Sequence, residues 1–338
     1  MLRNDRSAPR WPGGAKFAFT IFDDTDMMTL ENGRPVYDVI TDLGMRITKS
    51  VWPVLPDGPA RTGGATCEDA DYRAWVLGLQ DTGHEIGIHN ASDHPSKRPT
   101  TERALDRFAE IFGHDPRIGA DHVGNFEAMY WGPARLTGIR SRAYALGTRV
   151  TRPYRQPTEG EVPTSEYFWG DLLRDRIDYW RNFTFDDINT LRACPDLPYH
   201  DPARPYVNWW FAASQAPTLD ALVDLLAPSN LDRLEQQGGA CIVYTHLGLR
   251  YANDGVVDPR FATALERVAE RDGWFAPVSE VLDHIRAERA TTTGDRPLST
   301  RERSRMENRW ITDQVTTRAG SELQRLGRRV RGLKEPWQ

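Results

Sequence analysis

The chain has 338 residues, 39% of them hydrophobic and 27% charged, which is enough to bury one large core or two modest ones. Its formal net charge of -5 is uneven, because residues 290–338 hold eleven Lys and Arg against six Asp and Glu and leave the rest near -10. An acidic body argues against a nucleic-acid enzyme, and no run approaches the roughly 18 apolar residues of a membrane span.

The three cysteines, Cys67, Cys194 and Cys241, are far apart and form no CxxC pair. This spacing indicates neither a disulfide framework nor a thiolate zinc site, and it suits a reducing compartment. Residues 1–12 are charged, contain proline and lack the apolar core of a signal peptide. We therefore expect a cytoplasmic protein.

Strand-like and helix-like segments alternate through the first third of the chain. The expected elements are a strand at 16–22, a helix at 34–43, a strand at 45–52, a helix at 68–82, a strand at 85–88 and a helix at 100–112. Later strands are expected at 207–212, 240–245 and 274–277, and later helices at 218–226, 230–237, 259–271 and 279–288. About seven strands, each mostly followed by a helix, predict a closed or nearly closed βα barrel.

We expect three regions: an N-terminal extension at 1–14, the barrel at 15–289 and a basic C-terminal tail at 290–338. Residues 289–309 are polar and rich in Thr and Arg, so a linker is expected there. From Trp310 onward, apolar residues recur loosely at helical spacing among arginines. Such a helix could dock on the barrel, on a partner or on an anionic membrane surface.

Ionisable residues follow three of the expected strands. The strand at 16–22 leads into Asp23, Asp24 and Asp26, the strand at 85–88 ends at His89, and the strand at 240–245 ends at His246. The carboxyl ends of parallel strands meet at one edge, so these residues predict a shared site. The simpler alternative is that the acids cap the next helix and that backbone groups hold each histidine.

A second histidine, His94, follows His89 after five residues. Two imidazoles this close, facing a carboxylate from a neighbouring strand, can hold zinc or a similar divalent ion.

Several of these segments carry a family resemblance. Phe22-Asp23-Asp24, the run Gly-His-Glu-Ile-Gly-x-His about sixty residues later, the strand that ends at His246 and the segment 274–282 resemble the polysaccharide deacetylases, carbohydrate esterase family 4, with its NodB-homology domain. The order and spacing agree over about 15–289. The resemblance implies a deformed (β/α)7-type barrel. Asp-Asp-Thr-Asp with the segments 34–38, 44–49 and 51–53 is similar to a subgroup encoded among genes for O-antigen and other surface polysaccharides.

The resemblance implies a metal-dependent hydrolase that removes an N-acetyl group from a sugar of a polysaccharide or its precursor. Asp23 matches the catalytic base and His246 the general acid, while Asp24 and His89 match metal ligands. The implied cofactor is a divalent metal, Zn²⁺ first, with Co²⁺ and Ni²⁺ as alternatives. The implied partner is an N-acetylated saccharide, with no nucleic acid, and the basic tail would hold the enzyme near the inner face of the membrane.

The chain departs from the family pattern at three places. The family's second metal histidine falls at Asp93, with His94 one place later, so either residue is a candidate ligand. The Arg-Pro-Pro-Tyr-Gly-like motif is missing, and His122 and Asn125 stand in that segment instead. Asp26 stands where many relatives have Pro.

We expect four residues to contact substrate: Asp26, His122 and Asn125, and Trp52, whose ring is suited to stacking on a sugar although large aromatics are more often core. Two other functions remain open. One is a carbohydrate-binding or regulatory protein that keeps the barrel without turnover, and the other is a hydrolase of another C-N bond on the same scaffold.

Overall fold

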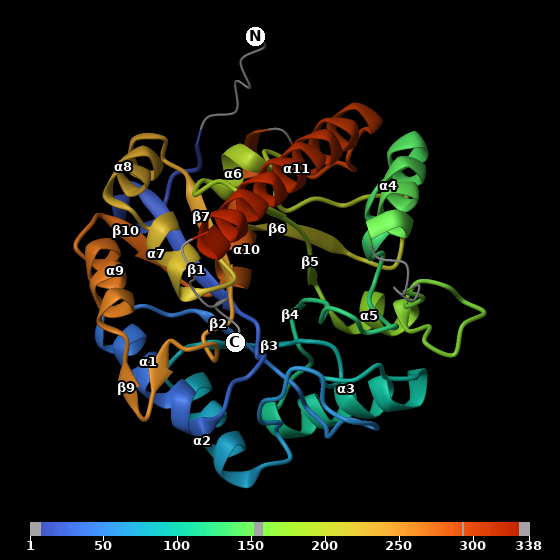
Figure 1. Cartoon of the computed structure of the whole chain (residues 1–338), viewed down its shortest axis with the longest axis horizontal. Helices are drawn as coiled ribbons and strands as arrows, with labels where there is room; N and C mark the ends of the chain where they lie inside the picture. The colour runs from blue at the N-terminus through green and yellow to red at the C-terminus, as the bar shows by residue number, and fades with distance from the viewer. Residues whose placement is uncertain (1–7, 152–157, 293, 331–338) are drawn as a thin grey trace.

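The structure, a computed structural model, describes residues 8–151, 158–292 and 294–330. Seven parallel strands close into a barrel because β1 pairs with β2 on one side and with β7 on the other (Figure 1). The strands are β1 (Phe17–Asp23), β2 (Thr48–Val51), β3 (Glu85–Ile88), β4 (Ile118–Gly119), β5 (Tyr179–Phe185), β6 (Trp209–Gln215) and β7 (Ala240–Thr245). A further strand, β10 (Gly273–Phe275), pairs in parallel with the first half of β1. The expected deformed (β/α)7-type barrel is confirmed.

The helices surround this barrel (Figure 1). They are α1 (Leu30–Asp42), α2 (Ala70–Asp81), α3 (Arg98–Phe112), α4 (Gly138–Thr151), α5 (Gly170–Arg176), α6 (Thr190–Ala193), α7 (Leu219–Leu225), α8 (Pro228–Gln236), α9 (Pro259–Ala269), α10 (Val278–Thr292) and α11 (Thr300–Val330). The shorter elements are the 3-10 turns η1 (Pro12–Gly14) and η2 (Gly132–Arg135) and the hairpin of β8 (Ala252–Asn253) with β9 (Val256–Val257).

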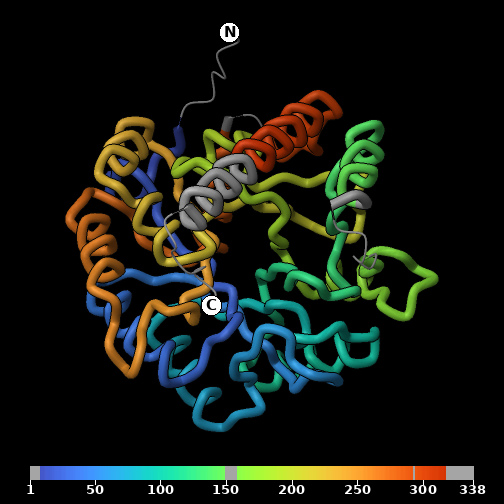
Figure 2. Tube along the Cα trace, viewed as in Figure 1, coloured from blue at the N-terminus to red at the C-terminus, as the bar shows by residue number. Residues whose placement is uncertain are grey.

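The barrel is deformed on the side of β4 and β5. β4 has two residues and meets β3 at one paired position, Ile88 with Gly119. The pairing of β5 with β6 changes register between Arg181 and Thr184. The opposite side is regular, with six consecutive pairs joining β1 to β7, and Figure 2 shows these two chain segments side by side.

Side chains of β1 alternate between two hydrophobic cores. Phe17, Phe19 and Ile21 belong to the outer core, which lies between the strands and α1, α2 and α7–α9. Ala18 and Phe22 belong to the core of the barrel interior. Because successive side chains of a strand point to opposite faces, Asp23 follows the outer set and Asp24 the inner one.

The sequence patterns did not predict the helices and strands between residues 117 and 196. The strand β5 reads Tyr-Trp-Arg-Asn-Phe-Thr-Phe, and the adjacent polar residues Arg181 and Asn182 interrupt the apolar run. Both are buried with partners: Arg181 binds Asp24, and Asn182 donates to the Tyr199 hydroxyl. Buried polar residues that are paired in this way do not give the alternation by which a strand is recognised.

The C-terminal region differs from the expected linker at 289–309, because α10 runs to Thr292 and α11 begins at Thr300. Ser299 and Glu302 form a capping box: the Ser299 hydroxyl accepts from the Glu302 backbone N–H, and the Glu302 carboxylate accepts from the Ser299 N–H. Further along α11, Trp310 is buried against the rings of Tyr144 and Phe183. This part of α11 therefore docks on the barrel.

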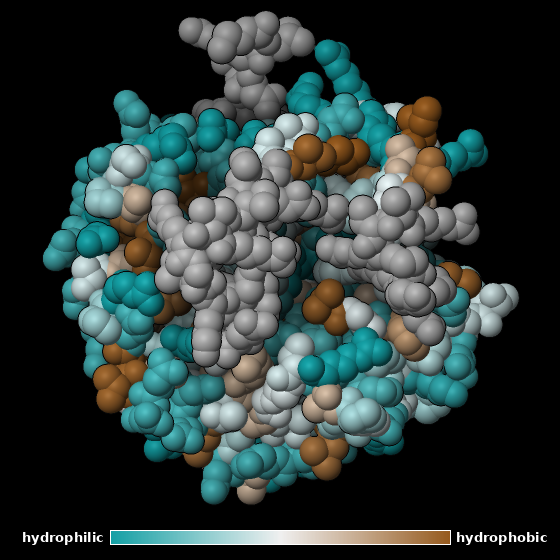
Figure 3. Space-filling model, in the orientation of Figure 1, coloured by the Kyte–Doolittle hydropathy of each residue, from teal (hydrophilic) through white to brown (hydrophobic). Residues whose placement is uncertain are grey.

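One face of the molecule can be judged for polarity. The face in Figure 3 is largely hydrophilic, with apolar side chains in small separate groups. Exposed apolar residues include Ile139 and Leu146 on α4 and Val315 on α11. Within the described ranges, no helix combines the length and apolarity needed to cross a membrane.

Candidate metal and catalytic site

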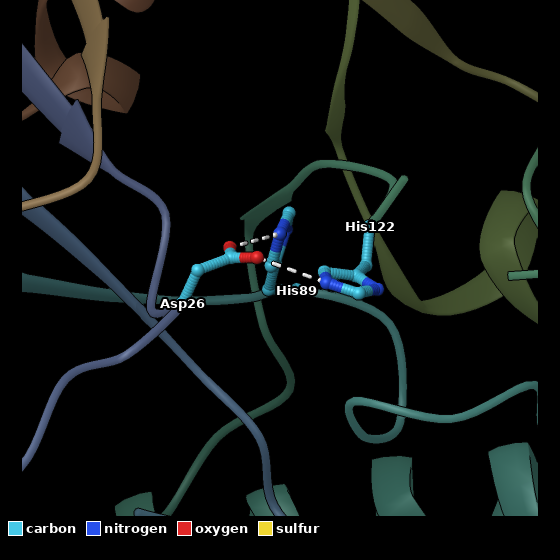
Figure 4. A group of neighbouring side chains, drawn as sticks. All are labelled: Asp26, His89 and His122. Atoms are coloured by element: carbon cyan, nitrogen blue, oxygen red, sulfur yellow. Dashed lines mark hydrogen bonds and ion pairs between the residues drawn. The ribbon is translucent and has the colours of Figure 1, made fainter. Parts of the chain in front are cut away.

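Three side chains that follow three strands of the barrel converge at the centre of the candidate site (Figure 4). Asp26 follows β1, His89 follows β3 and His122 follows β4. The Asp26 carboxylate lies 2.9 Å from Nε2 of His122 and 3.1 Å from Nε2 of His89. The three potential ligand atoms lie within 4.8 Å of one another, and all three residues are buried. This is a two-histidine, one-carboxylate group of the kind that binds a divalent metal.

The chemistry of the donors fits a metal. His89 Nδ1 lies 3.1 Å from the carbonyl oxygen of Ala120, which can only accept, so Nδ1 donates there, and Nε2, which donates to Asp26, is the nitrogen that can exchange its hydrogen for a metal ion. Metal-binding histidines usually donate their second nitrogen to such a partner. Burial alone would raise the pKa of Asp26, but hydrogen bonds with His122 and His89 hold that pKa well below its usual range. Asp26 is therefore a carboxylate at neutral pH.

Trp52 packs against both histidines of this group. Its Nε1 donates to the backbone oxygen of His89 over 2.9 Å, and its indole stacks on the His89 ring at 6.4 Å and meets the His122 ring edge-on at 5.6 Å. Trp52 is fully buried. This corrects the expectation that Trp52 stacks on a sugar, because a buried indole has no face to offer a ligand.

Asp24 forms the second carboxylate of the site and is paired with Arg181. The guanidinium of Arg181 donates to both oxygens of Asp24, at 2.8 and 2.6 Å. Arg181 lies between the rings of Phe22 and Tyr244, at 5.0 and 4.3 Å from their centres. Burial opposes ionisation of Asp24, but Arg181 together with His89 and His246 outweighs it, and the pKa of the carboxyl is lowered. Asp24 also lies 3.7 Å from His89 Nε2, next to the group of Asp26.

His246 joins the same cluster from the end of β7. Its Nδ1 lies 2.9 Å from the carbonyl oxygen of Pro217, and its Nε2 lies 3.2 Å from the Tyr244 hydroxyl and 3.9 Å from Asp26. Asp24, Asp26 and His246 together offer ligand atoms within 4.8 Å of one another. The side chain of His246 is 18% exposed, against 9% or less for the acids and histidines beside it. The cluster therefore meets solvent on the His246 side.

Asp23, expected as the catalytic base, lies outside this cluster. Its carboxylate accepts from the Tyr37 hydroxyl and from the Leu247 backbone N–H, both at 2.8 Å, and lies 3.4 Å from the buried Lys49 ammonium. Burial raises the pKa of Asp23, although Lys49 and the two hydrogen bonds act in the opposite direction. Asp23, the last residue of β1, faces the outer helical layer because side chains alternate along the strand, and Asp24 follows on the other face.

The structure does not bring His94 to the cluster. The Nδ1 of His94 lies 3.0 Å from the oxygen of Pro95, and its ring packs so closely on Gly58 that an added Cβ would lie 2.5 Å from Nε2. Asp93 borders the site, at 3.5 Å from His122 Nε2. Its oxygens accept backbone N–H groups of Arg61, Thr62 and Gly63, so it anchors the loop that follows β2.

The remaining expected substrate residues, Asp26, His122 and Asn125, are placed as follows. Asp26 and His122 lie in the centre of the candidate metal group. Asn125 is fully buried and bonds to His122, Ser92 and Glu127. Sequence reasoning missed Arg181, although an arginine among aromatic residues of a strand signals a buried pair, because an unpaired buried charge is very costly.

Comparison with known proteins shows similarity in structure and none in sequence. No protein-family model matches the chain, and no curated protein is similar to it in sequence. The chain is similar in structure to Puue allantoinase, with a TM-score of 0.51 and 12% identity, covering 87% of this chain and 96% of that chain. It is also similar to a protein of Mycobacterium smegmatis assigned as a polysaccharide deacetylase (TM-score 0.49, 12% identity, 86% and 96% covered).

A third similar structure is a probable polysaccharide deacetylase from Pseudomonas aeruginosa PAO1 (TM-score 0.46, 14% identity, 87% and 97% covered). Structures that resemble this chain over most of its length thus include polysaccharide deacetylases. At such low identity the likeness shows the fold alone, which is the deformed barrel of parallel strands described above.

Proposed function

We propose that this protein is a metal-dependent hydrolase of a C-N bond whose substrate is an N-acetylated sugar of a polysaccharide or its precursor. One observation carries the proposal: Asp26, His89 and His122 present a carboxylate and two Nε2 atoms to one another within 4.8 Å. We assign these three residues as the metal ligands. This set keeps His89, and it has Asp26 and His122 in place of Asp24 and of His94 or Asp93, which the family resemblance implied.

Zinc is the best candidate ion, because two imidazoles and one carboxylate form the ligand set of many hydrolytic zinc sites, with Co²⁺ and Ni²⁺ as alternatives. When bound, such an ion supplies Lewis acidity to a carbonyl oxygen and to water. We expect one ion rather than two. A second ion on Asp24 and His246 would compete with Arg181, which already occupies both oxygens of Asp24.

Asp24 and His246 supply the proton transfers in this proposal. Asp24 is ionised at neutral pH because Arg181 lowers its pKa, and it lies beside the metal group. It would accept the proton of the attacking water. His246 Nε2 lies on the more exposed side of the cluster, where it would donate a proton to the departing amine. Asp24 thus takes the role that the family pattern gives to Asp23.

The sugar substrate rests on the order and spacing of the deacetylase motifs over 15–289. A second candidate, a hydrolase of another C-N bond, is supported by the structural likeness to an allantoinase. Both candidates use the same metal group, and they differ in the product released.

The test is to incubate the full chain, loaded with Zn²⁺, with N-acetylglucosamine oligosaccharides and to measure acetate and ammonia separately. We expect acetate release that a chelator stops and that added Zn²⁺ restores. Ammonia without acetate from a panel of amides would favour the second candidate. Hydrolysis of a cyclic amide opens the ring and releases no second product, so ring opening is measured as well. Zinc-loaded protein that binds the oligosaccharide, releases neither acetate nor ammonia and opens no cyclic amide would contradict both candidates and favour a binding protein without turnover.

A further inference from the structure

Asn125 lies on the Nδ1 side of the His122 ring, while Asp26 lies on the Nε2 side. The Asn125 Oδ1 atom is 3.3 Å from His122 Nδ1, and Asp26 Oδ1 is 2.9 Å from His122 Nε2. Asn125 is fully buried. A buried amide in contact with a candidate metal ligand acts on that ligand rather than on a substrate.

The partners of Asn125 fix which way its amide points. Its Nδ2 donates to the backbone oxygen of Ser92 over 3.0 Å and to a carboxyl oxygen of Glu127 over 2.9 Å. Glu127 is itself held by the backbone N–H of Ser96, at 3.0 Å. Turning the amide over would place its oxygen against the carbonyl of Ser92, where no hydrogen is available. The oxygen of Asn125 therefore faces His122.

An amide oxygen only accepts, so it selects one form of the histidine. Nδ1 of His122 therefore carries a hydrogen, which leaves Nε2, 2.9 Å from Asp26 Oδ1, as the nitrogen that can exchange its hydrogen for a metal ion. The backbone is held as well: the His122 N–H donates to Oδ1 of Asn90, a residue with a φ of 54° directly after His89. Ring and backbone of His122 are thus both fixed by asparagines.

We propose that Asn125 is a positioning residue that fixes the tautomer and ring orientation of His122 for metal binding. This inference rests on the proposed metal site. His89 receives the same support from the backbone oxygen of Ala120, which no side-chain substitution removes. The two histidine ligands therefore differ in a testable way, because the Nδ1 partner of His122 is a replaceable side chain.

The test compares Asn125→Ala with a matched control, Asn182→Ala, in the full chain. Asn182 is also a buried asparagine, on β5, with its Nδ2 donating to the Tyr199 hydroxyl over 3.1 Å. The dissociation constant for Zn²⁺ is measured by competition with a chromogenic chelator. We expect Asn125→Ala to weaken Zn²⁺ binding by about 10–100-fold, the usual effect of losing a hydrogen-bond partner of a metal ligand. Asn182→Ala is expected to bind Zn²⁺ as the wild type does.

A second readout needs no variant. The ¹⁵N chemical shifts of the imidazoles in the zinc-loaded wild type identify the nitrogen that binds the ion, and we expect Nε2 of His122 with a hydrogen on Nδ1. Zinc bound through Nδ1 of His122, or unchanged Zn²⁺ affinity in Asn125→Ala, would overturn the role of Asn125. A wild type that binds neither Zn²⁺ nor Co²⁺ would instead overturn the proposed metal site itself.

Discussion

The two faces of β1 carry the same kind of residue in different roles. On the outer face, Asp23 is buried against the helical layer with Lys49 as its nearest cation and hydrogen bonds from Tyr37 and Leu247. On the inner face, Asp24 pairs with Arg181 and lies beside His89. The side-chain alternation of a strand decides which carboxylate reaches the site, although the two are adjacent in sequence.

Each face also supplies its own cation, since a buried carboxylate without a partner is costly. The outer cation, Lys49, has no exposed surface, and its ammonium also contacts Thr25 and the Ser50 backbone oxygen. The outer pair therefore connects structural elements, while the inner pair lies beside groups that can hold a metal. The two neighbouring carboxylates, Asp23 and Asp24, therefore differ in role because different groups surround them.

The largest expected difference between the faces is in metal binding. Asp26→Ala removes the shared carboxylate of the proposed metal group and should weaken Zn²⁺ binding by more than the about 100-fold that loss of a supporting hydrogen bond can cost. Asp23→Asn should leave the affinity within a few-fold of the wild type. Chelator competition on both purified variants is the measurement. An equal loss of Zn²⁺ affinity in the two variants would contradict the separate roles assigned to the two faces of β1.

The next difference concerns turnover. Asp24→Asn keeps the shape of the side chain but removes the proposed base, so kcat for acetate release should fall by about 10²–10⁴-fold. Its zinc content should stay at one ion per chain. Asp23→Asn, assayed at a temperature where circular dichroism shows it folded, should keep most of its kcat. The assignment fails if Asp23→Asn loses more activity than Asp24→Asn.

Stability should depend on the buried ion pair of each face, and the outer pair can be tested without changing the site. Asp23→Asn leaves the buried Lys49 ammonium without its carboxylate, and breaking a buried ion pair in this way costs about 3–5 kcal/mol. Adding Lys49→Met removes the stranded charge and should recover a large part of that loss. Urea unfolding of the two single variants and the double variant gives the coupling free energy. Additive losses would show that the two residues do not act as a pair.

The outer layer should also respond to pH through His84, which is buried directly before β3 and contacts α1 and the residue before β2. Its Nδ1 accepts from the Ile47 N–H, and its Nε2 contacts the Thr41 hydroxyl, which itself donates to the Tyr37 backbone oxygen. Burial lowers the pKa of His84 from 6.5 to about 4. Below pH 6.5 the unfolded chain therefore takes up a proton that the folded chain does not. The free energy of unfolding should fall between about pH 6.5 and 4 and show no His84 effect above that range.

The expected size is up to about 3 kcal/mol at the low end of this range. His84→Asn keeps an acceptor for Ile47 and cannot take up the proton, so its stability should decline less steeply as the pH falls from 6.5 to 4. Parallel slopes for the wild type and His84→Asn, from urea unfolding at several pH values, would contradict the role of burial at this histidine.

Much of the fold could be predicted from the sequence, and the reasons are local. The strand ranges 85–88 and 240–245 match β3 and β7, because uninterrupted short apolar runs with sharp ends are easily read. β5 could not be read, since Arg181 and Asn182 are acceptable in a buried strand only when their distant partners are known. The helix over 300–309 was missed because its polar residues outweighed the capping box of Ser299 and Glu302.

The region of the site could also be predicted, but the roles within it were less accessible. Asp24, His89 and His246 follow the ends of parallel strands and were expected to lie together, and the distances between them agree with this expectation. The position of Asp23 follows from strand alternation, which was available in the sequence. The pairing of His122 with Asp26 was not, because it depends on how β4 and its loop turn toward β1.

The central claim is that one divalent ion binds at Asp26, His89 and His122. The most direct measurement is a crystal structure of the zinc-loaded full chain with anomalous data at the zinc edge. We predict one anomalous peak about 2.0–2.2 Å from an Asp26 oxygen and from Nε2 of both histidines, with Asp24 still bound to Arg181. A peak coordinated by Asp23 or His94, or no peak in zinc-soaked crystals, would contradict the account.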